Sequence, residues 1–113
     1  MKPETVPDAG DLVWLTFDPQ SEREQAGRRP ALVLSPAQYN RKSGLALVCP
    51  ITSHVKGYPF EVELPPGLQV TGAILADHLK CLDWRAGRAE PAGRLPKQLL
   101  HDVLDRLAAL LGY

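Results

Sequence analysis

The sequence predicts an α+β fold, mainly β, in which short antiparallel strands form a small barrel and one amphipathic helix ends the chain. Two observations lead to this prediction. Eleven Pro and nine Gly indicate frequent turns, and frequent turns favour short strands over a helical bundle. The last segment has a different period, because apolar residues recur there at the three- and four-residue spacing of a helix face. At 113 residues, one domain spanning residues 1–113 is expected.

The N-terminal half contains two predicted strands separated by a polar loop. Asp11 to Phe17 carries apolar residues on both sides, as expected for a strand that is covered on two faces. Pro19 to Arg29 forms a polar loop that is long for a compact domain, and such loops are often functional. Pro30 to Pro36 is the second strand. Pro36 to Gly44 has the composition of a turn-rich connection.

The following segments are shorter and interrupted by turn residues. Leu45 to Thr52 is predicted as a third strand, and its internal Pro50 indicates an edge position or a bulge. Further short strands are predicted at Phe60–Leu64, Thr71–Ala76 and Leu79–Trp84. Between residues 85 and 96 the sequence is compatible with small strands or turns.

The C-terminal segment has the pattern of an amphipathic helix. Pro96 suits its first turn and Gly112 its end. Packing against the core explains this apolar stripe, although it has more members than one face of a small barrel requires, and a dimer contact is the alternative. The stripe consists of Leu99, Leu100, Val103, Leu104, Leu107, Leu110 and Leu111.

Charge and cysteine content set broad limits on function. Thirteen basic and thirteen acidic residues give a formal net charge of zero, which neither favours nor excludes a nucleic-acid partner. Cys49 and Cys81 are predicted to be two buried free thiols, with a disulfide as the alternative. No metal site is expected, since the sequence has no CxxC motif or Cys/His cluster. Neither a signal peptide nor a membrane span is recognisable, so a cytoplasmic location without membrane contact is predicted.

The first candidate functional segment is the charged loop from Glu22 to Arg29. Arg29 precedes Pro30 and is therefore expected in an extended conformation at the start of a strand, just after a turn at Gly27. A guanidinium held in this way suits a phosphate, because its planar fork donates two parallel hydrogen bonds. The alternative is a solvated surface loop in which Arg28 and Arg29 pair with nearby carboxylates.

The second candidate segment follows the third predicted strand. Thr52, Ser53, His54 and Lys56 place hydroxyls, an imidazole and an ammonium at a strand end, where scaffolds often present functional groups. His54 has the chemistry of a general base, although a single loop histidine is more often merely exposed. The pair Asp77-His78 is a weak candidate for a catalytic dyad, because adjacent residues in an extended segment point in opposite directions.

Absent motifs narrow the possible reactions. The sequence has no phosphate-binding glycine loop, nucleophile elbow, HExxH motif or carboxylate cluster for a divalent metal. Cleavage of RNA is a reaction that side chains alone can catalyse, because the substrate supplies its own 2′-hydroxyl nucleophile. The reaction needs a base for that hydroxyl, and positive charge and hydrogen bonds for the pentacoordinate phosphorane. Glu, Arg and Thr side chains meet these needs, so no cofactor or metal is expected.

Six segments of the chain form a recognisable series. They are VPDAGDLVWLTFDP (Val6–Pro19), EQAGRRPALVLSP (Glu24–Pro36), YN (Tyr39-Asn40), CPITS (Cys49–Ser53), KGYPFEV (Lys56–Val62) and ILADHLKCLDWRA (Ile74–Ala86), followed by the closing helix. In this order they resemble the MazF/PemK family, the toxins of bacterial type II toxin–antitoxin pairs.

This resemblance implies a small SH3-like antiparallel barrel of the PemK/CcdB type that forms a homodimer. It implies a sequence-specific, metal-independent endoribonuclease, an mRNA interferase, that cuts single-stranded RNA and chiefly mRNA. The expected products carry a 2′,3′-cyclic phosphate and a 5′-hydroxyl. The expected partners are this RNA and a cognate MazE-like antitoxin that wraps the toxin and blocks its RNA groove.

The resemblance also implies roles for individual residues. Arg29 and Thr52 match the family's principal catalytic pair, and Glu24 matches a carboxylate that is catalytic in some members and is here the expected general base. Arg28 adds a charge that would attract RNA. The residues expected to line the RNA groove are Asn40, Ser53, His54, Lys56, Asp77 and His78. The sequence departs from close relatives at Thr16 and His78, where Asp and Gln are familiar.

Two other functions remain as alternatives. A CcdB-like toxin shares this scaffold but poisons DNA gyrase without catalysis. A degenerate family member would bind only its antitoxin, although the presence of both Arg29 and Thr52 argues against that.

Overall fold

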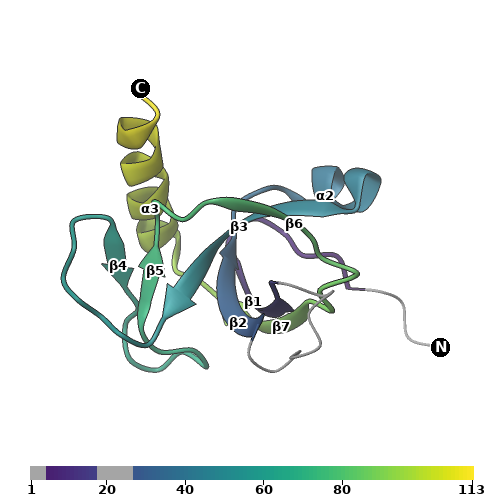
Figure 1. Ribbon diagram of the computed structural model, residues 1–113, viewed down its shortest axis with the longest axis horizontal. Helices are drawn as coiled ribbons and strands as arrows, with labels where there is room; N and C mark the ends of the chain where they lie inside the picture. Colours follow the sequence, from purple (N-terminus) through teal and green to yellow (C-terminus); the bar gives the residue numbers. More distant parts are fainter. Residues whose placement is uncertain (1–4, 18–26) are drawn as a thin grey trace.

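The computed structural model describes residues 5–17 and 27–113 (Figure 1). Seven strands and two helices lie within these ranges. In chain order they are β1 (Asp11–Thr16), β2 (Arg28–Val33), α2 (Ala37–Ser43), β3 (Leu45–Thr52), β4 (Glu61–Glu63), β5 (Ala73–Leu75), β6 (Lys80–Asp83), β7 (Glu90–Arg94) and α3 (Lys97–Leu110).

The strands form one antiparallel sheet in the order β4-β5-β3-β2-β1-β7, and β6 pairs with β3 beside this path. β3 pairs with β2 along one edge and with β6 and then β5 along the other. Figure 1 shows β3 running between α2 and β6 at one end and β4 and β5 at the other. The predicted fold class is confirmed, although the barrel is open: within residues 5–17 and 27–113, β4 and β7 do not pair with each other.

Pro50 occupies an interior position of β3, so the prediction of an edge strand or bulge is wrong. It is buried and lies opposite Ala31 of β2. On the other edge of β3, pairing with β6 ends at Val48 and pairing with β5 begins at Ile51. Pro50 falls in the gap between these two ladders, where a missing N–H removes no ladder bond.

Residues of β1, β2 and β3 alternate between two hydrophobic cores. Each of these strands is therefore covered on two faces, as predicted for β1. In β1, Leu12 belongs to the core beneath α3, whereas Val13 and Leu15 belong to the core that contains Trp84. Trp14 is the exception, since 40% of its surface is exposed. Two packed faces hold these three strands in place, and the ends of β2 and β3 are therefore a rigid base for a site.

The helix α3 packs on the first core through four of the seven residues of its apolar stripe. Val103 and Leu107 are buried, and Leu99 and Leu100 pack partly against the core. The other three members of the stripe are exposed, so core packing alone does not account for it. They are Leu104 at 43%, Leu110 at 50% and Leu111 at 64% exposure. No helix in the described ranges is long and apolar enough to cross a membrane.

The segment predicted as a turn-rich connection contains the helix α2. Pro36 occupies its N-cap, and Gly44 ends it in the left-handed conformation with φ of 76°. Pro and Gly therefore mark the two ends of a short helix here. Cys49 and Cys81 are both free thiols, as predicted, but Cys81 is exposed. It lies on β6, which among the described strands pairs with β3 alone.

Candidate active site

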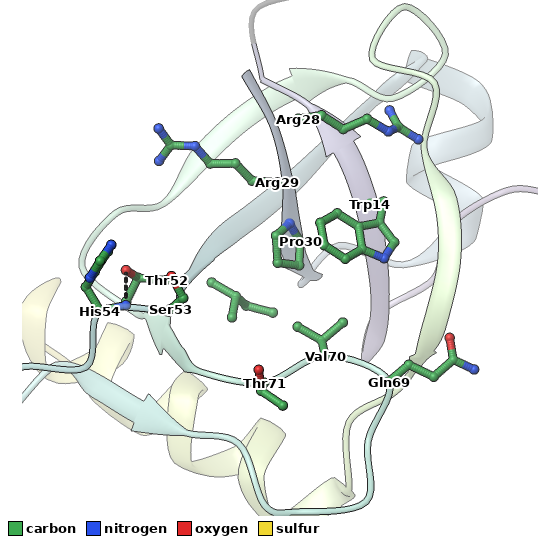
Figure 2. A pocket seen from close by; sticks show the side chains of 11 residues that line it. Trp14, Arg28, Arg29, Pro30, Thr52, Ser53, His54, Gln69, Val70 and Thr71 are labelled. Carbon is green, nitrogen blue, oxygen red and sulfur yellow. Dashed lines mark hydrogen bonds between the residues drawn. The ribbon is translucent and has the colours of Figure 1, made fainter. Parts of the chain in front are cut away.

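A cavity of about 520 Å³ opens where β2 begins and β3 ends (Figure 2). The antiparallel pairing of these two strands brings the start of one beside the end of the other. Its lining combines two guanidiniums, hydroxyls and an imidazole with an exposed indole. The lining residues are Trp14, Arg28, Arg29, Pro30, Ile51, Thr52, Ser53, His54, Gln69, Val70 and Thr71.

Arg28 and Arg29 point to opposite sides of β2, as adjacent residues of a strand must. Figure 2 shows the Arg29 guanidinium on the same side as Thr52 and His54, whereas Arg28 points away from them. The Arg29 side chain is exposed and makes no hydrogen bond or ion pair within the described ranges. Its fork of donors is therefore available for an anion.

Arg28 is already bound within the protein. Its Nη1 donates to Thr16 Oγ1 and to the Gly87 carbonyl, each at 3.1 Å. Its Nη2 donates to the Arg88 carbonyl at 2.9 Å and pairs with Glu90 at 2.7 Å. Arg28 therefore ties β2 to the segment before β7. Thr16, one of these partners, is buried.

Thr52 is the last residue of β3 and faces the cavity. Its Oγ1 accepts a hydrogen bond of 3.0 Å from the backbone N–H of His54. Since a hydroxyl accepts and donates at once, its proton remains available for a phosphate oxygen. Gly72 lies behind Thr52 with φ of 122°, and a Cβ there would be 2.0 Å from the Thr52 carbonyl oxygen. Only glycine allows this approach of the two backbones.

A second cavity, of about 390 Å³, adjoins the first and shares Thr52 and His54 with it. The shared residues form the wall between the two cavities. Lys56 Nζ lies 5.7 Å from the centre of the Tyr58 ring. The residues that line the second cavity are Thr52, His54, Lys56, Tyr58, Glu61, Leu75, Asp77 and His78.

Asp77 and His78 do not point in opposite directions, contrary to the sequence prediction. They lie in a turn that the His78 N–H closes by donating to the Leu75 carbonyl at 3.0 Å. His78 Nε2 and Asp77 Oδ1 are 3.8 Å apart, which is too long for a hydrogen bond. Both side chains line the second cavity instead.

The prediction that Asn40 lines an RNA groove is wrong, because its side chain is fully buried. Its Oδ1 accepts from Ser35 Oγ at 2.6 Å, and its Nδ2 donates to the carbonyls of Pro7 and Ser35 at 2.8 and 2.9 Å. Its own carbonyl accepts from Trp84 Nε1 at 2.8 Å. Asn40 holds α2 against the sheet, far along β3 from Thr52.

The structure thus brings together most of the predicted site residues. Glu24 is not among them, because it lies outside the described residues. Arg28, Arg29, Thr52, Ser53 and His54 line the first cavity, and Lys56, Asp77 and His78 join Thr52 and His54 in the second.

Four lining residues of the first cavity were missed in the sequence, namely Trp14 and the segment Gln69–Thr71. Trp14 lies opposite Pro30 in the pairing of β1 with β2, next to Arg29. The exposure of Trp14, which sets it apart on a strand otherwise rich in core residues, is visible only in the structure. The 69–71 segment carries no signal in the sequence either, since only the return of the chain toward β5 places it at the cavity.

Cys49 lies on β3 near this site but does not take part in it. Burial, together with the nearby Asp77 carboxylate, raises the pKa of the Cys49 thiol to about 12. Its Sγ donates to the Ala76 carbonyl at 3.7 Å. The thiol therefore stays neutral and unreactive at physiological pH.

Comparison with known families decides the relationship of this chain. The family described as "PemK-like, MazF-like toxin of type II toxin-antitoxin system" matches residues 8–111. The chain belongs to this toxin family.

Individual MazF and PemK proteins support the assignment. The endoribonuclease toxin MazF of Escherichia coli K12 is 47% identical over 107 residues, covering 95% of this chain and 96% of that protein. The Escherichia coli endoribonuclease PemK is 32% identical over 108 residues, covering 92% of this chain and 81% of PemK.

Solved MazF structures have the same fold. A crystal structure of MazF from Deinococcus radiodurans matches with a TM-score of 0.89 and 57% identity, covering 97% of this chain and 100% of that one. A MazE–MazF structure from the same organism matches with a TM-score of 0.88 and 54% identity at the same coverage. The recognised resemblance to MazF and PemK is therefore confirmed.

Proposed function

We propose that this chain is a sequence-specific, metal-independent endoribonuclease that cuts single-stranded RNA, chiefly mRNA, as the toxin of a type II toxin–antitoxin pair. One observation carries the catalytic part of this proposal. Arg29, which has no partner among the described residues, and Thr52, whose hydroxyl proton is available, line the same cavity. The expected products carry a 2′,3′-cyclic phosphate and a 5′-hydroxyl.

The reaction begins when a base removes the proton of the substrate's 2′-hydroxyl. The oxygen attacks the adjacent phosphorus, the bond to the 5′-oxygen breaks, and that oxygen takes up a proton. Arg29, always protonated at neutral pH, stabilises the negative charge of the phosphorane and of the leaving oxygen. Thr52 donates its hydroxyl proton to a non-bridging oxygen.

Glu24 is the proposed general base, by analogy with family members in which this carboxylate is catalytic. His54 is the alternative base, because it lines both cavities beside Thr52. Comparison of Glu24→Gln with His54→Gln decides between them. The variant that lacks the base should lose kcat and the acidic limb of the pH–rate profile, while the other should retain both.

The two cavities support a path for the RNA strand across their shared wall. The scissile phosphate would lie at Thr52, within reach of Arg29, with nucleotides on one side near Trp14 and on the other near Lys56. Single bases stack well on exposed aromatic rings, and the Trp14 indole offers such a surface. Ser53, Asp77 and His78 would contribute the polar contacts that distinguish bases.

Two protein partners belong to the same proposal. The similar Deinococcus radiodurans MazF has been crystallised with MazE, and an equivalent antitoxin is proposed for this chain. A homodimer is proposed from the family, and the exposed leucines of α3 are compatible with self-association. The cytoplasm is the proposed location, because mRNA is available there.

The test uses the purified protein with a long single-stranded RNA of defined sequence in excess EDTA. Cleavage at a short recurring motif, with cyclic-phosphate and 5′-hydroxyl ends, is the expected result. Intact RNA together with trapped gyrase–DNA complexes would instead establish the CcdB-like alternative. Intact RNA with antitoxin binding alone would establish a degenerate toxin.

A further inference from the structure

The loop between β3 and β4, residues 53–60, carries much of the second cavity but little regular structure. Ser53, His54, Lys56 and Tyr58 are all exposed along it. An exposed loop of this kind must be fixed by other contacts if it is to hold side chains in one geometry. Four hydrogen bonds from this loop converge on one carboxylate.

Glu61, the first residue of β4, accepts hydrogen bonds from three consecutive backbone N–H groups of this loop. Its Oε1 accepts from Gly57 at 2.7 Å, from Lys56 at 3.0 Å and from Tyr58 at 3.3 Å. Its Oε2 accepts from Lys56 at 3.3 Å. Hydrogen bonds to an ionised acceptor are among the strongest in proteins, so this group closes the loop firmly.

Gly57 gives the loop the shape that makes this convergence possible. Its φ of 80° lies in the left-handed region, and a left-handed residue in a turn lets successive N–H groups point into one concavity. Such a concavity binds anions, and here the anion is a side chain of the same protein.

Both Glu61 and the loop that it binds are attached to the rest of the protein. Glu61 pairs with Leu75 of β5, and the neighbouring Val62 is buried in the core. Within the loop, the carbonyl of Pro59 accepts a hydrogen bond of 2.8 Å from Arg106 of α3. The loop is therefore anchored on the sheet and on α3.

These hydrogen bonds also compensate the charge of Glu61 in the wall of the cavity. A carboxylate in the wall of an RNA site would repel phosphate groups. Glu61 directs its charge to three N–H donors, which compensate it, while Lys56 remains as the exposed cation of the same loop.

We infer that Glu61 is a positioning residue of the proposed RNase, which fixes the 53–60 loop so that Lys56, Tyr58 and His54 form one wall of the RNA site. This inference rests on the proposed function. Glu61 need not touch RNA, and its loss should weaken substrate binding more than the chemical step at Arg29 and Thr52.

The test compares Glu61→Ala, Glu61→Gln and a matched control, Glu63→Ala, in steady-state cleavage of a short RNA. Glu63 lies two residues further along β4, is exposed and lines neither cavity, so its loss removes the same charge. Glu61→Ala should raise KM about tenfold, equivalent to about 1.4 kcal/mol, with kcat changed less than threefold. Glu61→Gln should recover part of this loss, because its amide oxygen still accepts N–H bonds. Glu63→Ala should keep the KM of the original protein or lower it slightly.

Two results would overturn the inference. One is an unchanged KM in Glu61→Ala. The other is a lower KM in both Glu61 variants, which would mean that the carboxylate only repels RNA.

A second measurement does not depend on RNA cleavage. The amide protons of Lys56, Gly57 and Tyr58 should exchange slowly in the original protein and at least tenfold faster in Glu61→Gln, while core amides of β3 stay protected in both. Fast exchange of these amides in the original protein would overturn the positioning role of Glu61 even if the enzyme is active. If the original protein fails to cleave RNA but shows this protection, the proposed function fails, while Glu61 still fixes the loop.

Discussion

Polar side chains lie near both ends of β3, but their hydrogen-bond partners differ. At the Leu45 end, Ser35, Asn40 and Trp84 form a polar network in which every group is bonded inside the protein. At the Thr52 end, hydroxyl, imidazole and ammonium groups face two adjoining cavities. The first end holds the fold together, and the second has donors left over for a ligand.

The partners of a polar residue, and not its type, therefore separate a structural role from a functional one. The adjacent arginines of β2 show the same contrast over a single residue. Arg28 has four acceptors within the protein, whereas Arg29 has none among the described residues. Each prediction below tests one side of this comparison.

The largest effect is expected for Arg29→Ala. Removing the charge that stabilises the phosphorane should lower kcat/KM for RNA roughly 10²- to 10³-fold, while the thermal midpoint stays within about 2 °C. Arg28→Ala is the comparison variant. It should lower the thermal midpoint and reduce cleavage less than about tenfold, because its main partners are in the protein. Greater loss of cleavage in Arg28→Ala than in Arg29→Ala would reverse the assignment.

Asn40→Ala should affect stability and not chemistry. It leaves the Ser35 hydroxyl and two carbonyls without their partner in a buried site, which should cost about 3 kcal/mol in the free energy of unfolding. Urea unfolding measures this loss, and cleavage per folded molecule should be unchanged. Gln38→Ala, an exposed position on the same helix, is the control and should change stability by less than about 0.5 kcal/mol. If Asn40→Ala is stable but inactive, the polar network at the Leu45 end of β3 has a role in catalysis.

Thr52→Val replaces the hydroxyl with a methyl of similar size. The loss of a donor to the phosphate should lower kcat/KM roughly 10- to 100-fold, and Thr52→Ser should retain most of the activity. Single-turnover cleavage measures the chemical step. Equal activity in Thr52→Val and the original protein would show that the hydroxyl does not take part.

The smallest effect concerns Cys49, which lies between the two ends of β3. Its thiol has a folded-state pKa of about 12, whereas an unfolded thiol titrates near 8.5. The folded state therefore keeps a proton that the unfolded state releases. The contribution of this thiol to stability is present below the unfolded pKa and is lost as pH rises toward 12, by at most about 1.4 kcal/mol per pH unit.

Urea unfolding at pH 8 and at pH 10 measures this effect as the difference between the original protein and Cys49→Ala. Cys81→Ala is the control, because Cys81 is exposed and should leave the pH dependence intact. If the pH dependence of stability is identical in Cys49→Ala and the original protein, ionisation of the thiol does not destabilise the fold. Cys49 would then resemble the groups at the Thr52 end of β3.

Much of the fold could be predicted because hydrophobic pattern and turn residues act locally. The predicted strand Leu45–Thr52 has the bounds observed for β3, and the helix predicted from the leucine spacing is α3. The helix α2 was missed because its only buried member is Asn40, a polar residue that gives no apolar periodicity. β7 was uncertain because Pro91 and Gly93 are poor strand residues, and it forms by pairing with β1.

Residues of the candidate site could be predicted where a polar or charged side chain stands at the end of a predicted strand. Arg29 before Pro30 and Thr52 at the end of an apolar run are such positions. Trp14 and the 69–71 segment could not be placed from the sequence. Trp14 reaches the cavity through the pairing of β1 with β2, and the 69–71 segment through the loop that joins β4 to β5. Asn40 was assigned wrongly, since the sequence does not reveal whether a polar group finds its partner inside or outside the protein.

The close approach of Gly72 to Thr52 has a consequence for the history of such a gene. A toxin harms its own cell whenever its antitoxin is lost, so survivors carry mutations that silence it. A side chain at position 72 would overlap the Thr52 carbonyl, so the two backbones must move apart at the cavity, although position 72 lies outside both cavity linings. Escape mutations should therefore accumulate at this glycine, and copies of the gene that have lost their toxicity should reveal it as readily as they reveal Arg29.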